Sequence, residues 1–249
     1  MKPYNQDFIL QEIQEYNSLI NESICGKYKI EKNNSLGKHI QGYMYENNYQ
    51  YDIPVIQLLK DNVSLMRLTP KEIESSYEVI KFARGKVGIV GLGLGYVVQK
   101  IAQKSKVQEV IVYEISEEVI NMYKKNFGNN EKVKIIHGDA FNASSEKFDF
   151  FYVDIYEYKL DLKVVEDYKR FNELHDIEEY TFWGMEHFLL SCKYEDIIWV
   201  YIPEVWVEMS KRLYTSLDMS GYIKYYKQLD EDMVKEILLA FKEILNEGM

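Results

Sequence analysis

Three glycines alternate with leucines directly after a short apolar segment of the chain. The glycines are Gly91, Gly93 and Gly95, and the preceding residues 87–90 are typical of a buried strand. Glycine lets the backbone turn sharply, and its missing Cβ lets a ligand come close to the main chain. The helix predicted from residue 96 to about residue 103 would offer free N–H groups and a positive dipole end to a polar or anionic group. The pattern predicts a ligand-binding loop, with a turn between two buried elements as the alternative.

Acidic residues follow the next three predicted strands. Glu114 ends the strand-like residues 109–113, Asp139 follows residues 133–136, and Asp154 ends residues 148–153. Glu114 lies about 20 residues past the glycines, where a nucleotide-binding βαβ unit places the acid that accepts hydrogen bonds from a ribose diol. Asp139 could instead bond its own backbone as a turn former. Because ligands bind at the carboxyl ends of open parallel sheets, the series predicts one site at that edge.

The series of glycines and acids resembles the Rossmann-like S-adenosylmethionine-dependent methyltransferases, and especially their spermidine-synthase-like branch. The resemblance covers roughly residues 65–156. It implies that the glycines pass under the amino-acid part of the cofactor S-adenosylmethionine, that Glu114 binds the ribose hydroxyls, and that Asp139 with Ala140 meets the adenine. The cofactor-binding residues that it implies are Gly91, Gly93, Gly95, Glu114, Ile115, Asp139, Ala140 and Asp154.

Two positions depart from the patterns of the family. Many members carry an acid two residues before the first glycine, where this chain has Ile89. Aminopropyltransferases carry an aspartate inside the glycine run, where this chain has only leucines. A dinucleotide-binding loop would need its third glycine at position 96, which is Tyr96. The spacing therefore favours S-adenosylmethionine over NAD.

The candidate catalytic residues follow the last of these strands. Asp154 could orient an amine or accept its proton as a methyl group is transferred, and Tyr156 would help to form the pocket wall. Glu157 stands where the Asp-x-x-Asp of aminopropyltransferases has its second acid. The predicted function is methyl transfer to a small-molecule or peptide acceptor. The alternatives are aminopropyl transfer from decarboxylated S-adenosylmethionine and a non-catalytic nucleoside-binding protein of the same fold.

These residues require an α/β protein with a Rossmann-like, doubly wound, mostly parallel sheet over residues 65–249. A small helical and β-stranded region over residues 1–64 should precede it. Thr69, Pro70 and Glu72 predict a capping box at the start of a helix. The other elements expected are a helix over residues 7–21, strands over 42–45, 53–59 and 63–66, a helical stretch over 161–192, a fifth strand over 197–202, and helices over 205–217 and 232–245.

Composition narrows the classes of partner. With 40 acidic and 30 basic residues in 249, the formal net charge is −10, which disfavours a nucleic-acid partner. No apolar run reaches the roughly 18 residues of a membrane span, and the first residues lack the apolar core of a signal peptide. Cys25 and Cys192 have no disulfide or metal spacing. We expect a cytoplasmic protein without metal or membrane partner, and leave its oligomeric state open between monomer and homodimer.

Overall fold

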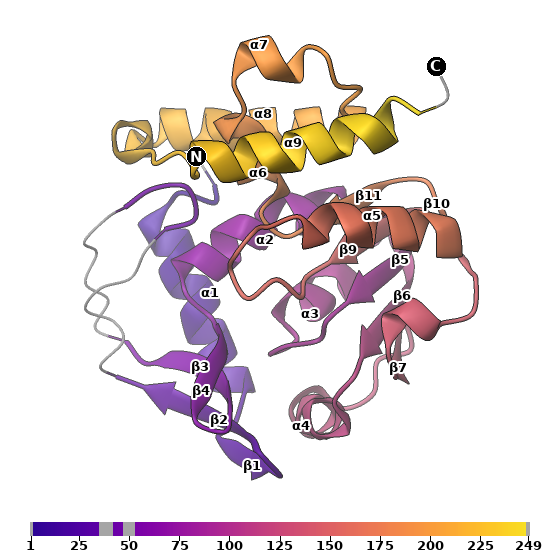
Figure 1. Cartoon of the computed structure of the whole chain (residues 1–249). Coiled ribbons are helices and arrows are strands. Elements are labelled where there is room, and N and C mark those ends of the chain that lie inside the picture. The colour runs from indigo at the N-terminus through magenta and orange to yellow at the C-terminus, as the bar shows by residue number, and fades with distance from the viewer. Residues whose placement is uncertain (1, 35–41, 47–52, 248–249) are drawn as a thin grey trace.

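The computed structural model describes residues 2–34, 42–46 and 53–247, and Figure 1 shows how their helices and strands are arranged. The main sheet has five parallel strands in the order β11-β9-β5-β6-β7. These strands are β5 (Gly85–Val90), β6 (Val107–Glu114), β7 (Val133–His137), β9 (Phe150–Val153) and β11 (Tyr180–Phe182). The chain moves outward from β5 to β7 on one side and from β9 to β11 on the other. This order confirms the predicted Rossmann-like, doubly wound α/β fold.

The strands of the main sheet bury consecutive apolar side chains rather than alternate ones. Val110, Ile111 and Val112 in β6 are each at most 1% exposed. Such continuous burial is typical of parallel strands that are covered on both faces. Val90 at the end of β5 pairs with Tyr113 on one side and Val153 on the other. The carboxyl ends of β5, β6 and β9 therefore meet at one edge of the sheet.

Helices flank the strands of this sheet, and the helix predicted from residue 96 lies where the sequence places it. They are α2 (Pro70–Phe82), α3 (Tyr96–Ala102), α4 (Glu117–Phe127) and α5 (Lys163–Leu174). Ser116 caps α4 by accepting a hydrogen bond from the Val119 N–H at 3.3 Å, and Gly128, with φ +67°, follows its last residue. The start of α2 differs from the prediction. Thr69 occupies the N-cap position, but its side chain makes no capping hydrogen bond, so the predicted capping box with Glu72 is wrong.

The N-terminal region combines one helix with a small antiparallel sheet of order β1-β2-β3-β4. Its elements are α1 (Gln6–Leu19), β1 (Ser23–Cys25), β2 (Tyr28–Asn33), β3 (Val55–Lys60) and β4 (Val63–Arg67). Asp61 and Asn62 join β3 to β4 in a tight turn with positive φ at both residues, as hairpin turns require. The sheet confirms the strands predicted over 53–59 and 63–66, and adds two strands that the sequence pattern does not predict. β4 crosses the proposed division at residue 64, and the division into two domains stays a prediction.

The C-terminal helices gather along one side of the molecule, at the top of Figure 1. They are α6 (Met185–Ser191), α7 (Tyr194–Ile197), α8 (Glu204–Met219) and α9 (Glu231–Leu245). Trp206 from α8 and Phe241 from α9 pack ring to ring at 5.2 Å, and both side chains are fully buried. The two long helices confirm the elements predicted over 205–217 and 232–245.

Three other predicted elements are wrong in part or in whole. Tyr45 forms only an isolated bridge to Tyr226, so residues 42–45 are no strand. The helical stretch predicted over 161–192 is interrupted by β10 (Asp176–Ile177), which pairs with β8 (Lys147–Phe148), and by β11. The fifth strand is β11 rather than residues 197–202. Trp199 and Tyr201 are more than half exposed, so the apolar run there lies at the surface instead of in the sheet.

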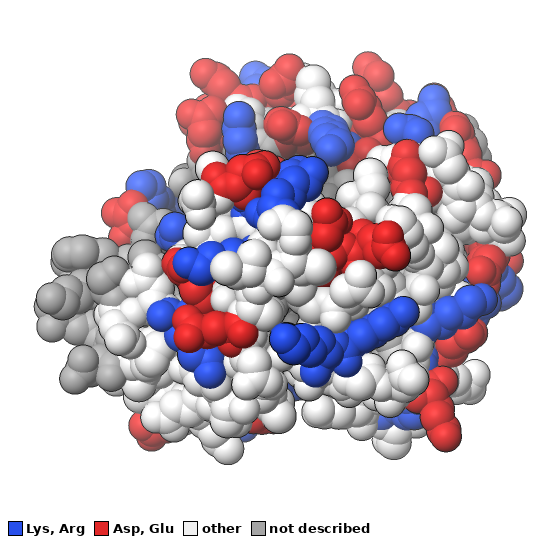
Figure 2. All heavy atoms as spheres, turned by 90° about the horizontal axis from the view of Figure 1, so that it is seen from below, with Lys and Arg blue, Asp and Glu red and all other residues white. Residues whose placement is uncertain are grey.

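Charged side chains of both signs are mixed on the face shown in Figure 2. Lysines and arginines form short groups there, separated by acidic and uncharged residues. Within the described ranges, none of the helices is long and apolar enough to cross a membrane.

Candidate functional site

A cavity of about 300 Å³ lies at the carboxyl edge of the main sheet. It sits between β5 and β9, where the strand order changes direction, which is where open α/β sheets bind ligands. The residues that the sequence predicts for the site and that line this cavity are Gly91, Gly93, Glu114, Ile115, Asp154 and Glu157. Parallel strand ends thus bring together residues that are up to 66 positions apart in the chain.

The glycine loop is held by contacts within the protein. Gly91, Gly93 and Gly95 have φ values of +99°, +50° and +79°, a region that other residues rarely adopt. A Cβ on Gly91 would lie 2.5 Å from the carbonyl oxygen of Asp154, and one on Gly93 would lie 2.5 Å from the Met66 sulfur. A side chain at either position would therefore clash with the protein itself, while both glycines still line the cavity. Gly95 does not line the cavity and stands at the N-cap of α3.

Glu114 connects the end of β6 to the glycine loop. Its carboxylate accepts hydrogen bonds from the Leu92 N–H at 3.1 Å and from the Ser116 N–H at 2.8 Å. Each carboxylate oxygen retains a lone pair for a further donor, such as a ribose hydroxyl. Ile115, which follows, is 72% exposed and lines the same cavity, so it offers an apolar surface beside that carboxylate.

Asp139 and Ala140 do not line this cavity. Asp139 accepts hydrogen bonds from the Phe141 N–H and from the Asn142 side chain, each at 3.0 Å. These bonds correspond to the turn-forming role that the sequence leaves open for Asp139. The assignment of both residues to adenine binding stays a prediction.

Two carboxyl groups, one half-buried and one buried, face the cavity from different elements. Asp154 follows β9, and Glu72 comes from the first turn of α2. Burial raises the pKa of Asp154 to about 7. Burial, together with the nearby charge of Asp154, raises the pKa of Glu72 to about 8. A carboxyl group that titrates near neutral pH can act as a general base, and a pair of this kind is stabilised by a cation.

Glu72 is the main functional candidate that the sequence pattern misses. One of its oxygens accepts a hydrogen bond from the Tyr158 hydroxyl at 2.7 Å, while Oε1 is buried without a hydrogen-bond partner in the described part of the chain. The sequence pattern assigns Glu72 to a capping box, but the side chain turns into the cavity. The sequence feature that could have indicated this role is an acid in the first turn of α2, the helix that precedes β5.

The segment after β9 makes a sharp turn at the rim of the cavity. Glu157 and Tyr158 have φ values of +47° and +61°, and a left-handed conformation at two consecutive residues with side chains is strained. The turn brings Glu157 and Tyr158 to the cavity. Tyr156 instead is buried away from the cavity, with its ring packed edge to face on Phe182 at 6.4 Å, so it does not form the predicted wall.

The N-terminal sheet forms the opposite wall of the cavity. Its contributing residues are Tyr28, Leu58, Lys60, Leu65 and Met66. The sulfur of Met66 accepts a hydrogen bond from the Leu94 N–H at 3.2 Å, which ties β4 to the glycine loop. The cavity is therefore enclosed by both regions of the chain.

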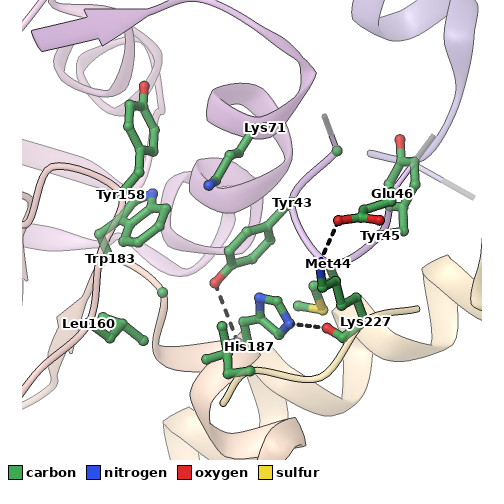
Figure 3. A pocket seen from close by; sticks show the side chains of 13 residues that line it. Tyr43, Met44, Tyr45, Glu46, Lys71, Tyr158, Leu160, Trp183, His187 and Lys227 are labelled. Atoms are coloured by element: carbon green, nitrogen blue, oxygen red, sulfur yellow. Dashed lines mark hydrogen bonds and ion pairs between the residues drawn. The ribbon is translucent and has the colours of Figure 1, made fainter. Parts of the chain in front are cut away.

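A second, smaller cavity of about 200 Å³ adjoins the first (Figure 3). Tyr158 lines both cavities, so they meet at this side chain. Trp183 and Gly184, which follow β11, line the second cavity, so it lies near the same edge of the sheet.

Comparison with known proteins gives partial similarities to solved structures. No family model and no curated protein matches the chain. Spermidine synthase from Thermotoga maritima is 14% identical, with a TM-score of 0.39 over 63% of this chain and 52% of that one. The 23S rRNA methyltransferase ErmE is 18% identical, with a TM-score of 0.36 over 45% of this chain and 44% of that one. The DhpI–SAM–HEP complex is 19% identical, with a TM-score of 0.30 over 40% of this chain and 44% of that one. The chain spans about half the length of these structures.

Proposed function

We propose that this protein is an S-adenosylmethionine-dependent methyltransferase that acts on a small-molecule or peptide acceptor. The observation that carries the proposal is the convergence of the glycine loop, Glu114 and Asp154 on one cavity at the switch point of the sheet. In this assignment the glycine loop and Glu114 hold the amino-acid and ribose parts of the cofactor. Ile115 contacts the nucleoside, and the adenine extends toward Asp139 and Ala140.

The charges of the cavity suit a cationic ligand. Among the described residues that line it are four acids, Glu72, Glu114, Asp154 and Glu157, and one base, Lys60. S-adenosylmethionine carries positive charge on its sulfonium and its ammonium group. Glu72, whose Oε1 is buried without a partner in the described part of the chain, would take the ammonium group in place of the family acid that is missing at Ile89. The residues present therefore fit the cofactor.

When bound, the cofactor supplies an electrophilic methyl group for in-line displacement by the acceptor. The contribution of this chain is to position the acceptor, which lowers the entropic part of the barrier. Asp154, with a pKa of about 7, would accept the proton that an amine or hydroxyl acceptor loses on methylation. Glu157, at the rim of the same cavity, would orient the acceptor, and the Tyr156 ring packs on Phe182 away from the cavity.

Aminopropyl transfer from decarboxylated S-adenosylmethionine is the second candidate. The position of Glu157 favours it, because this acid lies three residues after Asp154 and lines the same cavity. The two reactions leave different products, methylthioadenosine for aminopropyl transfer and S-adenosylhomocysteine for methyl transfer. A non-catalytic nucleoside-binding protein would yield neither.

A thermal-shift titration tests the proposal with S-adenosylmethionine, S-adenosylhomocysteine, decarboxylated S-adenosylmethionine, methylthioadenosine and NAD. A ligand at about 100 times its dissociation constant adds about 2.7 kcal/mol to the free energy of unfolding. For a chain of this length, the midpoint should rise by roughly 5–11 °C. We expect the rise with the first two ligands. A rise with the decarboxylated pair alone would favour aminopropyl transfer, and the absence of any rise would overturn both.

A further inference from the structure

The second cavity contains a half-buried cation that forms no ion pair with an acid in the described part of the chain. Lys71, at the second position of α2, points its ammonium group toward Tyr158 and Trp183 (Figure 3), with Nζ 5.1 Å and 5.5 Å from the two ring centroids. Within the described ranges of the chain, Lys71 makes no ion pair and no hydrogen bond. The neighbouring Glu72 faces the first cavity instead. The three N–H donors of Lys71 are therefore free for a ligand.

The other charged groups near this cavity are already engaged. Lys227, at the rim, forms an ion pair with Glu46. Glu186 accepts a hydrogen bond from the Tyr43 hydroxyl at 3.1 Å, and burial raises the pKa of Glu186 to about 8. Glu186 therefore holds its proton at neutral pH, and Lys71 supplies the unbalanced positive charge of the cavity.

His187 adds a hydrogen-bond acceptor to the lining of the second cavity. Its Nε2 lies 2.7 Å from the carbonyl oxygen of Lys227, and because a carbonyl only accepts, Nε2 must carry the proton. Burial lowers the pKa of His187 to about 4, so the ring is neutral and Nδ1 keeps its lone pair. Figure 3 shows the His187 ring between Lys227 and Tyr43.

Aromatic rings form the remaining walls. The ring centroids of Tyr43 and Trp183 lie 6.1 Å apart. The indole N–H of Trp183 donates a hydrogen bond to the Ser75 hydroxyl at 3.0 Å, which fixes the orientation of the indole. At about 200 Å³ the cavity is smaller than the roughly 300–1,000 Å³ that drug-sized ligands occupy. A ligand with one ring matches this size and these walls.

We propose that the second cavity binds the methyl acceptor through a carboxylate, and that the acceptor is a small aromatic acid. Lys71 pairs with the carboxylate, the ring packs against the wall that Tyr43 and Trp183 form, and His187 Nδ1 accepts a hydrogen bond from a hydroxyl or amino group of the ligand. In the part of the chain that the structure describes, one cation of this cavity lacks an ion pair, which matches the single charge of a carboxylate better than the double charge of a phosphate monoester. The assignment of the ligand as the acceptor rests on the proposed function, because Tyr158 lines both this cavity and the one assigned to the cofactor.

Ligand-observed NMR titrations without cofactor test the site, with benzoate and phenylacetate as probes and benzamide as their neutral analogue. The variants are Lys71→Met, which keeps the length of the side chain without its charge, and Lys71→Arg, which restores the charge. Lys81→Met is the matched control, because Lys81 is an exposed lysine on the same helix. We expect Lys71→Met to weaken binding of at least one carboxylate by tenfold or more, Lys71→Arg to restore it, and Lys81→Met to leave it unchanged. Benzamide should bind the wild type and Lys71→Met equally.

Two results would overturn the site: equal affinity of both carboxylates for the wild type and Lys71→Met, or no binding of either to the wild type up to about 10 mM. The same titrations repeated with S-adenosylmethionine separate this inference from the proposed function. If carboxylates bind in a Lys71-dependent way but S-adenosylmethionine does not bind, the carboxylate site stands and its role as the acceptor site is overturned. Binding of S-adenosylmethionine alone would keep the function and overturn the site.

Discussion

Glu72 and Asp154 reach the same cavity from different elements, and burial keeps both carboxyl groups from ionising at their usual pH. Their pKa values of about 8 and about 7 compare with about 4 in an unfolded chain. Between these values the folded protein binds more protons than the unfolded chain. The contribution of these two groups to the free energy of unfolding therefore decreases as the pH rises from about 4 to about 8.

Replacing Glu72 tests this dependence. In Glu72→Gln the group can no longer titrate, so the loss of stability between pH 5 and pH 8 should be smaller than in the wild type, by on the order of 2 kcal/mol. Urea unfolding at several pH values measures the difference. Glu117→Gln, which removes an exposed carboxyl group at the start of α4, should keep the wild-type dependence. Identical pH dependence in Glu72→Gln and the wild type would contradict the raised pKa.

Glu114 should dominate cofactor affinity among the residues of the site. Glu114→Ala removes a charged acceptor, and hydrogen bonds to charged groups contribute about 1.5–3 kcal/mol, so the dissociation constant for S-adenosylmethionine should rise by roughly 10- to 150-fold. Isothermal titration calorimetry well below the unfolding midpoint measures it. Glu117→Ala, three residues along, is the control and should bind as the wild type does. If Glu114→Ala kept wild-type affinity, the ribose would have to lie elsewhere.

At the scale of elements, the glycine loop is packed so tightly that side chains are excluded for reasons of folding. Gly91→Ala would place its Cβ 2.5 Å from a backbone oxygen, whereas a Cβ on Gly221 meets nothing within 4 Å, although both glycines have positive φ. Gly221→Ala should therefore cost roughly 1 kcal/mol of conformational strain, and Gly91→Ala a further 1–3 kcal/mol from the steric clash. Urea denaturation of the two variants gives the difference. Equal destabilisation would mean that the loop can move away from β9.

The elements that the sequence predicts best are those with long, regular patterns. The strands β5, β6, β7 and β9 are apolar runs that end in glycine or an acid, and parallel pairing alone brings their ends together, so Gly91, Glu114 and Asp154 could be placed in one site. β1 has only three residues, and in β2 only Tyr28 and Ile30 are buried apolar residues, so their apolar patterns are short. The run over 197–202 has a strand-like composition but lies at the surface, which composition does not reveal.

The parts of the site that sequence misses depend on contacts between distant elements. Glu72 faces the cavity because Tyr158, 86 residues later, donates a hydrogen bond to it. Tyr158 rather than Tyr156 reaches the cavity because two consecutive residues adopt positive φ, a conformation that neither glutamate nor tyrosine favours by itself. Local periodicity contains no information about either feature.

At the scale of the whole molecule, the N-terminal sheet and the Rossmann-like sheet enclose one cavity between them. A ligand bound there should slow amide hydrogen exchange on both sides, in residues 65–67 of β4 and in residues 92–95 of the glycine loop. Hydrogen exchange with and without S-adenosylmethionine measures this protection, and α9, which does not line the cavity, serves as the internal control. Protection of the glycine loop alone would show that the N-terminal sheet does not close over the ligand.

The burial of Glu72, Glu74 and Glu186 also affects how the protein behaves in an electric field. Burial raises the pKa of each to about 8, so all three mostly hold their protons at pH 7. The folded chain then has a net charge closer to about −7 than to the formal −10 of its sequence. In native electrophoresis it should migrate toward the anode as a less acidic protein, and focus above the isoelectric point of about 5.1 that its composition gives.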